Sequence, residues 1–139
     1  PTPAPPRFAV LVEALDFRSS SYYSGSYHDK SIRFDTFALR SYIRGRLAVL
    51  APQAQMLLDG RNADFVLRVQ YTGNPDEIHG TFILVDSQGV ILREDTAHVG
   101  MPFFNSDDMT PAAMKRAREI ADKLVPKFAP LIPTPVPAI

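Results

Sequence analysis

The side chains best suited to acid–base or metal chemistry are three histidines, His28, His79 and His98. No two of them have the spacing of a metal-ligand pair, and H-E-x-x-H does not occur, so the sequence predicts no metal site. His28 precedes Asp29, and such a pair could act as a general base with its orienting carboxylate. No nucleophile motif stands beside it, because the nearby Gly25-Ser26 lacks the G-x-S-x-G pattern. We expect no enzyme and no catalytic residue, and His28 with Asp29 is the enzymatic alternative.

Cofactor chemistry has equally little support. The seven glycines are scattered singly, so there is no glycine-rich phosphate loop, and the chain has no cysteine. Asp107 and Asp108 form an acidic pair, but no calcium-loop pattern surrounds them. An acidic residue before a helix caps the helix and complements its dipole. We therefore expect no cofactor, and we expect Asp107 or Asp108 to help cap the last helix.

Two aromatic segments are candidates for partner binding. Tyr22, Tyr23 and Tyr27 lie in a serine- and glycine-rich stretch, a composition typical of recognition loops. Alternatively, these tyrosines pack over a sheet edge. Phe103 and Phe104 are adjacent in an expected loop, where they could anchor a partner or lipid, or could cap the core beside the last helix.

Charge is balanced in total and uneven along the chain. Fifteen basic and fifteen acidic residues argue against nucleic-acid binding, which needs an excess of lysine and arginine. Arg33, Arg40 and Arg44 share one side of an expected helix. In residues 76–108, by contrast, Arg93 is the one basic residue among Lys and Arg, and the other charged residues are acidic. Such segregation usually marks solvated faces. It could also steer a partner, promote self-contact or meet anionic headgroups, so the three arginines are further partner-binding candidates.

Periodicity and turn residues predict a β-α-β-β-β-α order with one ambiguous element. We expect an α+β fold, a two-layer sandwich of two main helices on a mostly antiparallel sheet of about four strands. No apolar run approaches the roughly 18 residues of a membrane span. The expected elements are a central strand over 8–17, a loop over 18–31, a helix over 32–50, an ambiguous segment 53–58, strands over 64–72, 80–86 and 90–99, and a last helix from Thr110. The apolar stripe of that helix runs to Phe128, and Pro126 and Pro130 should stop the helix.

Proline defines the expected domain limits. Four of the thirteen prolines lie in residues 1–6 and five lie in the last fourteen residues, so both ends should be extended. We expect a proline-rich linker over 1–6, one α+β domain over 7–128 and a proline-rich tail over 129–139. A proline-rich leader before a compact domain is typical of exported or lipid-anchored bacterial proteins, with the anchoring cysteine upstream. An interdomain linker is the alternative.

Several short segments resemble those of small bacterial envelope lipoproteins. They are Asn62–Leu67, Gly80–Asp86, Gly89–Leu92 and the opening strand from Val10 to Phe17. Similar segments occur in the penicillin-binding-protein activator lipoproteins, the curli-secretion lipoprotein and the N-terminal domain of the Tol-system propeller protein. The second helix of those folds is hard to find in this sequence after Pro52.

The resemblance implies an exported, non-enzymatic adapter or scaffold, periplasmic and anchored at the outer membrane, whose partner is an envelope protein. It implies no catalytic residue. The alternative is an auxiliary subunit of an envelope transport system that binds lipid or another apolar ligand between helix and sheet, which predicts a lined apolar groove. The sequence leaves the oligomeric state open.

Overall fold

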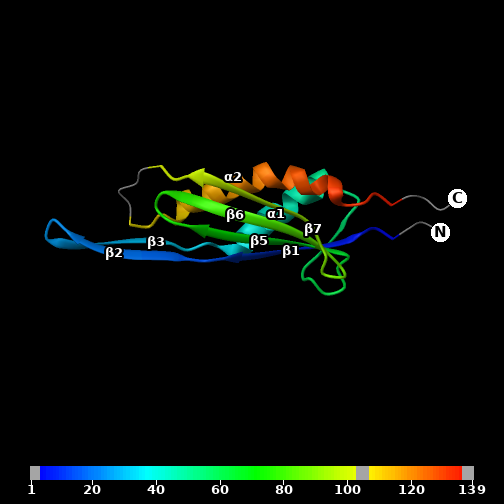
Figure 1. Ribbon diagram of the computed structural model, residues 1–139, viewed down its shortest axis with the longest axis horizontal. Coiled ribbons are helices and arrows are strands. Elements are labelled where there is room, and N and C mark those ends of the chain that lie inside the picture. The colour runs from blue at the N-terminus through cyan, green and yellow to red at the C-terminus, as the bar shows by residue number, and fades with distance from the viewer. Residues whose placement is uncertain (1–3, 103–106, 136–139) are drawn as a thin grey trace.

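The computed structural model describes residues 4–102 and 107–135, apart from the side chain of Tyr23. Within them lie two main helices, a five-stranded sheet and a separate two-stranded hairpin (Figure 1). The elements are β1 (Arg7–Ala14), β2 (Phe17–Tyr23), β3 (Ser26–Ile32), α1 (Thr36–Leu50), β4 (Gln55–Leu57), β5 (Phe65–Gly73), β6 (Glu77–Asp86), β7 (Ile91–Gly100), α2 (Thr110–Phe128) and the short 3₁₀ helix η1 (Ala129–Leu131).

The main sheet is mixed, with the strand order β4-β1-β5-β6-β7. β1 runs parallel to both of its neighbours, because the chain crosses over through α1 before it returns as β4 and β5. Tight turns make β5, β6 and β7 antiparallel. The α+β class with two main helices is confirmed, but the sheet has five strands, and β1 with its neighbours is parallel. The difference arises because the ambiguous segment forms β4, and parallel pairing leaves no local signal.

Both helices pack on one face of the sheet, and the core lies between these two layers. β5 shows the alternation plainly, since Leu67, Val69 and Tyr71 are buried while Arg68 and Gln70 are exposed. The helices contribute a matching apolar stripe to the same core: Leu39, Ile43 and Leu47 from α1, and Ala113, Ala117, Ile120, Ala121, Leu124, Val125 and Phe128 from α2.

α1 begins later than the sequence predicts. Its N-cap is Asp35, whose carboxylate accepts a hydrogen bond from the Ala38 N–H at 2.9 Å. Ile32, expected as the first helical residue, instead ends β3 and is fully buried. Val49 and Leu50, the last two residues of α1, are 74% and 45% exposed. Periodicity identified the helix, and the capping aspartate determines where it begins.

α2 begins as the sequence predicts, at the segment that carries Asp108, Thr110 and Pro111. The N-cap residue is Met109, which makes no side-chain capping hydrogen bond, so neither acidic residue is the N-cap. The Asp108 carboxylate instead accepts a hydrogen bond from the N–H of Thr110, the first helical residue, at 3.0 Å. Of the two prolines expected to stop the helix, Pro126 does not, because the helix continues through it to Phe128 and ends before Pro130. Phe128 is fully buried, and η1 and the buried Ile132 extend the packed region further. Packing against the sheet outweighs the helix-breaking tendency of the proline.

Residues 18–31 form a β-hairpin, and the expectation of a loop is wrong. Seven consecutive pairs join β2 to β3 without a register shift, from Phe17 with Ile32 to Tyr23 with Ser26. Ser24 and Gly25 make the turn with φ values of 54° and 80°, as a two-residue type I′ turn requires. Figure 1 shows the hairpin extending past the end of the main sheet, in line with β1.

Candidate protein-binding surface

The base of the β2–β3 hairpin is fixed to the body of the domain. The N–H of Ser31 donates to the Asp107 carbonyl, and the N–H of Met109 donates to the Ser31 carbonyl, both at 2.9 Å. On the other side of the base, the Phe34 N–H donates to the Asp16 carboxylate at 3.0 Å. These contacts tie the hairpin to the strand before it and to the segment that leads into α2. The hairpin is therefore a fixed projection whose direction the body determines.

Beyond its base, the hairpin is exposed to solvent. Residues 18–22 of β2 are all exposed, and the residues of β3 are exposed or half-buried until the strand reaches Ile32. Seven residues of strand span about 23 Å, at roughly 3.3 Å per residue. A two-stranded hairpin gains little stability from its own pairing. Its exposed side chains add little to the core of the domain and are available for contact with another molecule.

Tyr22 and Tyr27 form an aromatic pair near the tip of the hairpin. They face each other across the two strands, with ring centroids 5.0 Å apart and an interplanar angle of 63°, an edge-to-face arrangement. Their exposed fractions are 63% and 76%. The structure brings together these two predicted residues, although on strands rather than on a loop. The backbone of Tyr23 ends β2, and its side chain lies outside the described part of the chain.

The second aromatic candidate is not described. Phe103 and Phe104 fall within residues 103–106, outside the described ranges. The residues on either side are placed: the Met101 N–H donates to the Asp76 carbonyl at 2.7 Å, and Asp107 meets Ser31. This pair of phenylalanines therefore remains a prediction.

The three candidate arginines do not form one helical patch. Arg33 precedes α1, and its backbone N–H donates to the Thr110 hydroxyl at 2.9 Å. Arg40 is half-buried; it donates to the Leu58 carbonyl at 3.4 Å and lies 5.6 Å over the Phe37 ring. Arg44 is also half-buried. The shared helical side expected for all three is wrong for Arg33, because the helix begins after it. Arg40 and Arg44 are one turn apart on α1 and share a side, where both are half-buried.

His28 and Asp29 are not arranged as a catalytic pair. They are consecutive residues of β3, and successive side chains of a strand point to opposite faces. The His28 Nε2 lies 3.2 Å from the Ser26 hydroxyl at the exposed tip of the hairpin. Asp29 is therefore not placed to orient the imidazole. In the described ranges, 4–102 and 107–135, no group of three or more His, Asp or Glu side chains is arranged to hold a metal ion.

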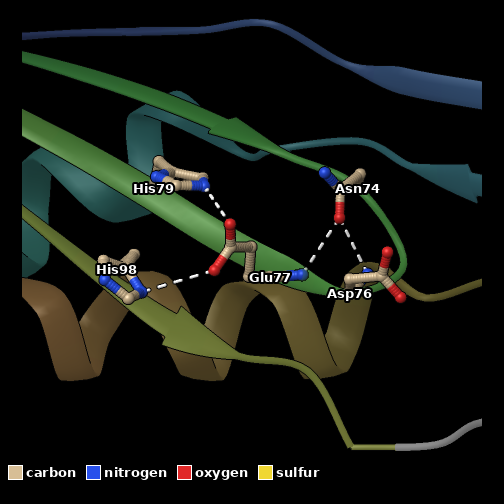
Figure 2. Close-up of polar contacts among 5 residues, drawn as sticks. All are labelled: Asn74, Asp76, Glu77, His79 and His98. Atoms are coloured by element: carbon tan, nitrogen blue, oxygen red, sulfur yellow. Dashed lines mark hydrogen bonds and ion pairs between the residues drawn. The ribbon is translucent and has the colours of Figure 1, made fainter.

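The structure contains a polar cluster on β6 and β7 that the sequence did not predict. Figure 2 shows the Glu77 carboxylate between two imidazoles, with Oε1 2.8 Å from His79 Nε2 and Oε2 3.3 Å from His98 Nδ1. The Asn74 side-chain oxygen accepts from the Asp76 and Glu77 N–H groups and shapes the preceding turn. The cluster joins two neighbouring strands near one end of the sheet. The side chains of Glu77, His79 and His98 are all partly exposed.

The sequence could not place these two histidines together. His79 pairs with His98 only because the register of β6 and β7 shifts between Leu84 and Val85. A regular hairpin around the expected turn at residues 86–89 would pair His79 with a different residue. The shift depends on packing across the sheet, and local sequence patterns do not reveal it.

The described grooves are small and partly charged. One, of about 360 Å³, lies on the sheet face opposite the helices and is lined by Leu11, Glu13, Arg68, Val69 and Gln70. Another, of about 350 Å³, lies beside β1 and α1 and includes Glu13 and Arg40. The layer between helices and sheet is occupied by the hydrophobic core. An apolar ligand held between helix and sheet therefore has little support in this geometry.

Comparisons with known proteins identify the fold alone. No family model matches the chain, and no curated protein matches it. Among solved structures, the chain is similar to an uncharacterised protein, with a TM-score of 0.56, 16% identity and coverage of 96% of this chain and 95% of that one. It is also similar to a PelC dodecamer from Paraburkholderia phytofirmans, with a TM-score of 0.51, 16% identity and coverage of 93% and 87%.

Two bacterial lipoprotein structures are similar at a lower level. A minor lipoprotein from Acinetobacter baumannii has a TM-score of 0.44, with 17% identity and 91% of both chains covered. The LpoB C-terminal domain from Salmonella enterica has a TM-score of 0.44, with 14% identity and coverage of 69% of this chain and 83% of that one. At such scores we draw no inference from these two structures. Within the described residues, no helix is both long and apolar enough to cross a membrane.

Proposed function

We propose that this domain is a non-enzymatic adapter of the bacterial cell envelope that binds a protein partner through the β2–β3 hairpin. The observation that carries the proposal is the exposed tyrosine pair on a projection fixed at its base. Tyr22 and Tyr27 are 63% and 76% exposed, whereas the core tyrosine Tyr71 is fully buried. Tyrosine buries a large area at little cost in side-chain entropy and offers a hydroxyl for hydrogen bonding, as recognition surfaces require.

The geometry of the hairpin supports a binding role. Its base is held by the backbone bonds of Ser31, so little conformational entropy is lost there when a partner binds. Its tip carries two aromatic rings already packed against each other in an edge-to-face pair. A preformed aromatic pair on an exposed projection favours a protein partner over a diffusible substrate, because small-molecule sites are concave and bury most of the ligand.

The envelope location rests on the resemblance to small envelope lipoproteins. The segments that carry that resemblance form β1, β5, β6 and β7, which are neighbours in one sheet. The proposal includes a periplasmic domain held at the outer membrane by a lipid anchor on an upstream cysteine. The chain has fifteen basic and fifteen acidic residues, which suits a protein partner better than a nucleic acid.

A crosslinking pulldown from cells that express the full precursor tests the proposal, after fractionation of the envelope. The wild-type chain is compared with a Tyr22→Ala/Tyr27→Ala variant. The matched control is Phe37→Ala, which removes another aromatic ring that is 69% exposed, on α1. Circular dichroism of the purified chains verifies that each variant folds.

We expect the wild type and the Phe37→Ala variant to recover one dominant envelope protein, and the double tyrosine variant to lose it. Equal recovery by all three chains would overturn the assignment to the hairpin. A precursor found outside the envelope fractions would overturn the location. Extraction of a bound lipid from the purified chain would favour the auxiliary-subunit alternative.

A further inference from the structure

Within residues 4–102 and 107–135, no strand other than β3 pairs with β2, so its outer edge has no strand partner there. The backbone N–H and C=O of Ser31 point away from β2 and bond to residues 107 and 109. Backbone groups alternate in direction along an antiparallel strand, so those of Asp29 and Tyr27 also point away from β2. Their partners across the hairpin are Ser20 and Tyr22, and Arg18 pairs with Ser31 itself. In an antiparallel pair, these partners direct their N–H and C=O groups away from β3. The outer edge of β2 therefore presents the backbone groups of residues 18, 20 and 22.

The two edges of the hairpin differ in what protects them. At its base, the β3 edge is already used by the segment at 107–109. The β2 edge, Phe17–Tyr23, contains no proline and no lysine, and its register has no bulge. Proteins normally use such features to prevent an exposed edge from pairing with another strand. Apart from the charge of Arg18, β2 carries no such feature, which indicates an edge that is suited to pairing.

We propose that β2 pairs with β2 of a second copy of this chain, antiparallel about a two-fold axis at Ser20. In this register Ser20 meets Ser20 of the second copy, and Arg18 meets Tyr22 of the second copy. All the outward backbone groups of these residues then find partners across the axis. The product is a continuous four-stranded antiparallel sheet, which is more stable than an isolated two-stranded hairpin.

The side chains that this pairing brings together favour β2 as the edge and a second copy as the occupant. Arg18 is the only charged residue of β2, and the two-fold places it opposite the Tyr22 ring, where a cation–π contact is available. The same operation on β3 would place Asp29 directly opposite Asp29 of the second copy, and like charges in that position are unfavourable. The chain is therefore self-complementary along β2 and not along β3.

The projection of the hairpin leaves room for two domains. Figure 1 shows β2 and β3 extending away from the helices and the main sheet. The two-fold pairs Phe17 with Tyr23 of the second copy, so the two domains lie at opposite ends of the joined sheet. Residues that pair directly across strands share a face, and the pair Tyr22–Tyr27 is therefore doubled on one face. This inference rests on the proposed function only in using the same hairpin.

Sedimentation velocity of the purified chain over a concentration series tests the inference. A Ser20→Pro variant removes an outward N–H without removing a bond to β3, and Asp29→Pro does the same on the opposite edge. We expect the wild type and Asp29→Pro to dimerise, and Ser20→Pro to raise the dissociation constant by about tenfold or more. A wild-type chain that stays monomeric, or a dimer that Ser20→Pro leaves unchanged, would overturn the inference.

Disulfide trapping keeps the test decisive if a proline variant fails to fold. The chain has no cysteine, so Ser20→Cys introduces a single thiol at the two-fold axis. Directly paired residues there have Cα atoms about 5.5 Å apart, within disulfide range. Under mild oxidation we expect a disulfide-linked dimer from Ser20→Cys and far less from Asp29→Cys. Equal yields would overturn the inference, and tyrosine-dependent partner capture by a monomeric chain would leave the proposed function intact.

Discussion

The N–H of Ser31 and the carbonyl of Asp107 lie 2.9 Å apart and join the base of the β2–β3 hairpin to the start of α2. This bond links segments that are distant in the sequence. Its partner bond, from the Met109 N–H to the Ser31 carbonyl, completes a short parallel bridge. The position of the tyrosine pair therefore depends on the last helix as well as on the hairpin.

Hydrogen exchange should reveal a gradient along the hairpin. In dilute protein, we expect the amides of Ser31 and Met109 to exchange at least about tenfold more slowly than that of Ser26, since the base opens with the body and the tip frays. Amide-resolved exchange by NMR measures this. A Thr110→Val variant, which removes the acceptor of the Arg33 N–H, should speed exchange at Arg33 and leave Ser26 unchanged. Uniform exchange along the hairpin would contradict the fixed base.

Asp64 should make stability depend on acidic pH. Its carboxylate accepts from the Arg7 N–H at 2.8 Å, and this bond and the Arg7 side chain hold the pKa of Asp64 below its ordinary value of 3.8. The stabilisation is present above that value and is lost as pH falls through the lower folded pKa. Asp64→Asn should cost about 1 kcal/mol at neutral pH, with a difference from wild type that shrinks below about pH 4.

Urea unfolding between pH 2 and 7 measures this difference. Asp29→Asn is the matched control, because Asp29 lies exposed on the hairpin, and its stability change should stay within about 0.5 kcal/mol at neutral pH. If the free energy of unfolding of Asp64→Asn differed from that of the wild type by the same amount at every pH, the charge of the Asp64 carboxylate would not be what stabilises the start of β1.

Gly80 should be required for close packing of α2 on the sheet. A Cβ at this position would lie 2.7 Å from Ile120 Cγ2 and 3.0 Å from Tyr71 Cε1, both fully buried side chains. We expect Gly80→Ala to destabilise the domain by about 1–3 kcal/mol, because a core this dense cannot accept an extra methyl group without moving. Gly100→Ala, where a Cβ would meet no atom within 4 Å, is the control and should be near neutral in chemical denaturation.

Tyr71 should contribute one buried hydrogen bond between sheet and helix. Its hydroxyl donates to the Ala117 carbonyl at 2.8 Å, and burial raises the pKa of Tyr71. Tyr71→Phe should cost about 1 kcal/mol near neutral pH. Because the folded pKa is raised, the contribution is present below about pH 10 and is lost as the unfolded chain ionises above it. The difference in free energy of unfolding between wild type and Tyr71→Phe should therefore shrink when urea unfolding is measured above about pH 10. A difference that does not change with pH would contradict this prediction. Tyr27→Phe, at an exposed site, is the control.

Local patterns in the sequence sufficed for the elements whose signals are local. The alternation of β5, the tight turn between β6 and β7, and the start of α2 at Thr110 all follow from residue periodicity and turn or capping chemistry, and all were predicted. The tyrosines were identified as candidates for the same reason, since a cluster of Tyr, Ser and Gly is itself a compositional signal.

Tertiary structure decided where those residues stand. The parallel pairing of β1, the passage of α2 through Pro126 and the meeting of Glu77 with His79 and His98 all depend on contacts between distant segments. Arg33 and Arg40 are separated because β3 ends at Ile32 and the N-cap Asp35 starts α1 only after Arg33. Sequence alone determined the class of the fold and the types of residue available. The turn at Ser24 and Gly25 pairs Tyr22 with Tyr27, and long-range contacts of Ser31 with residues 107 and 109 fix the hairpin that carries them.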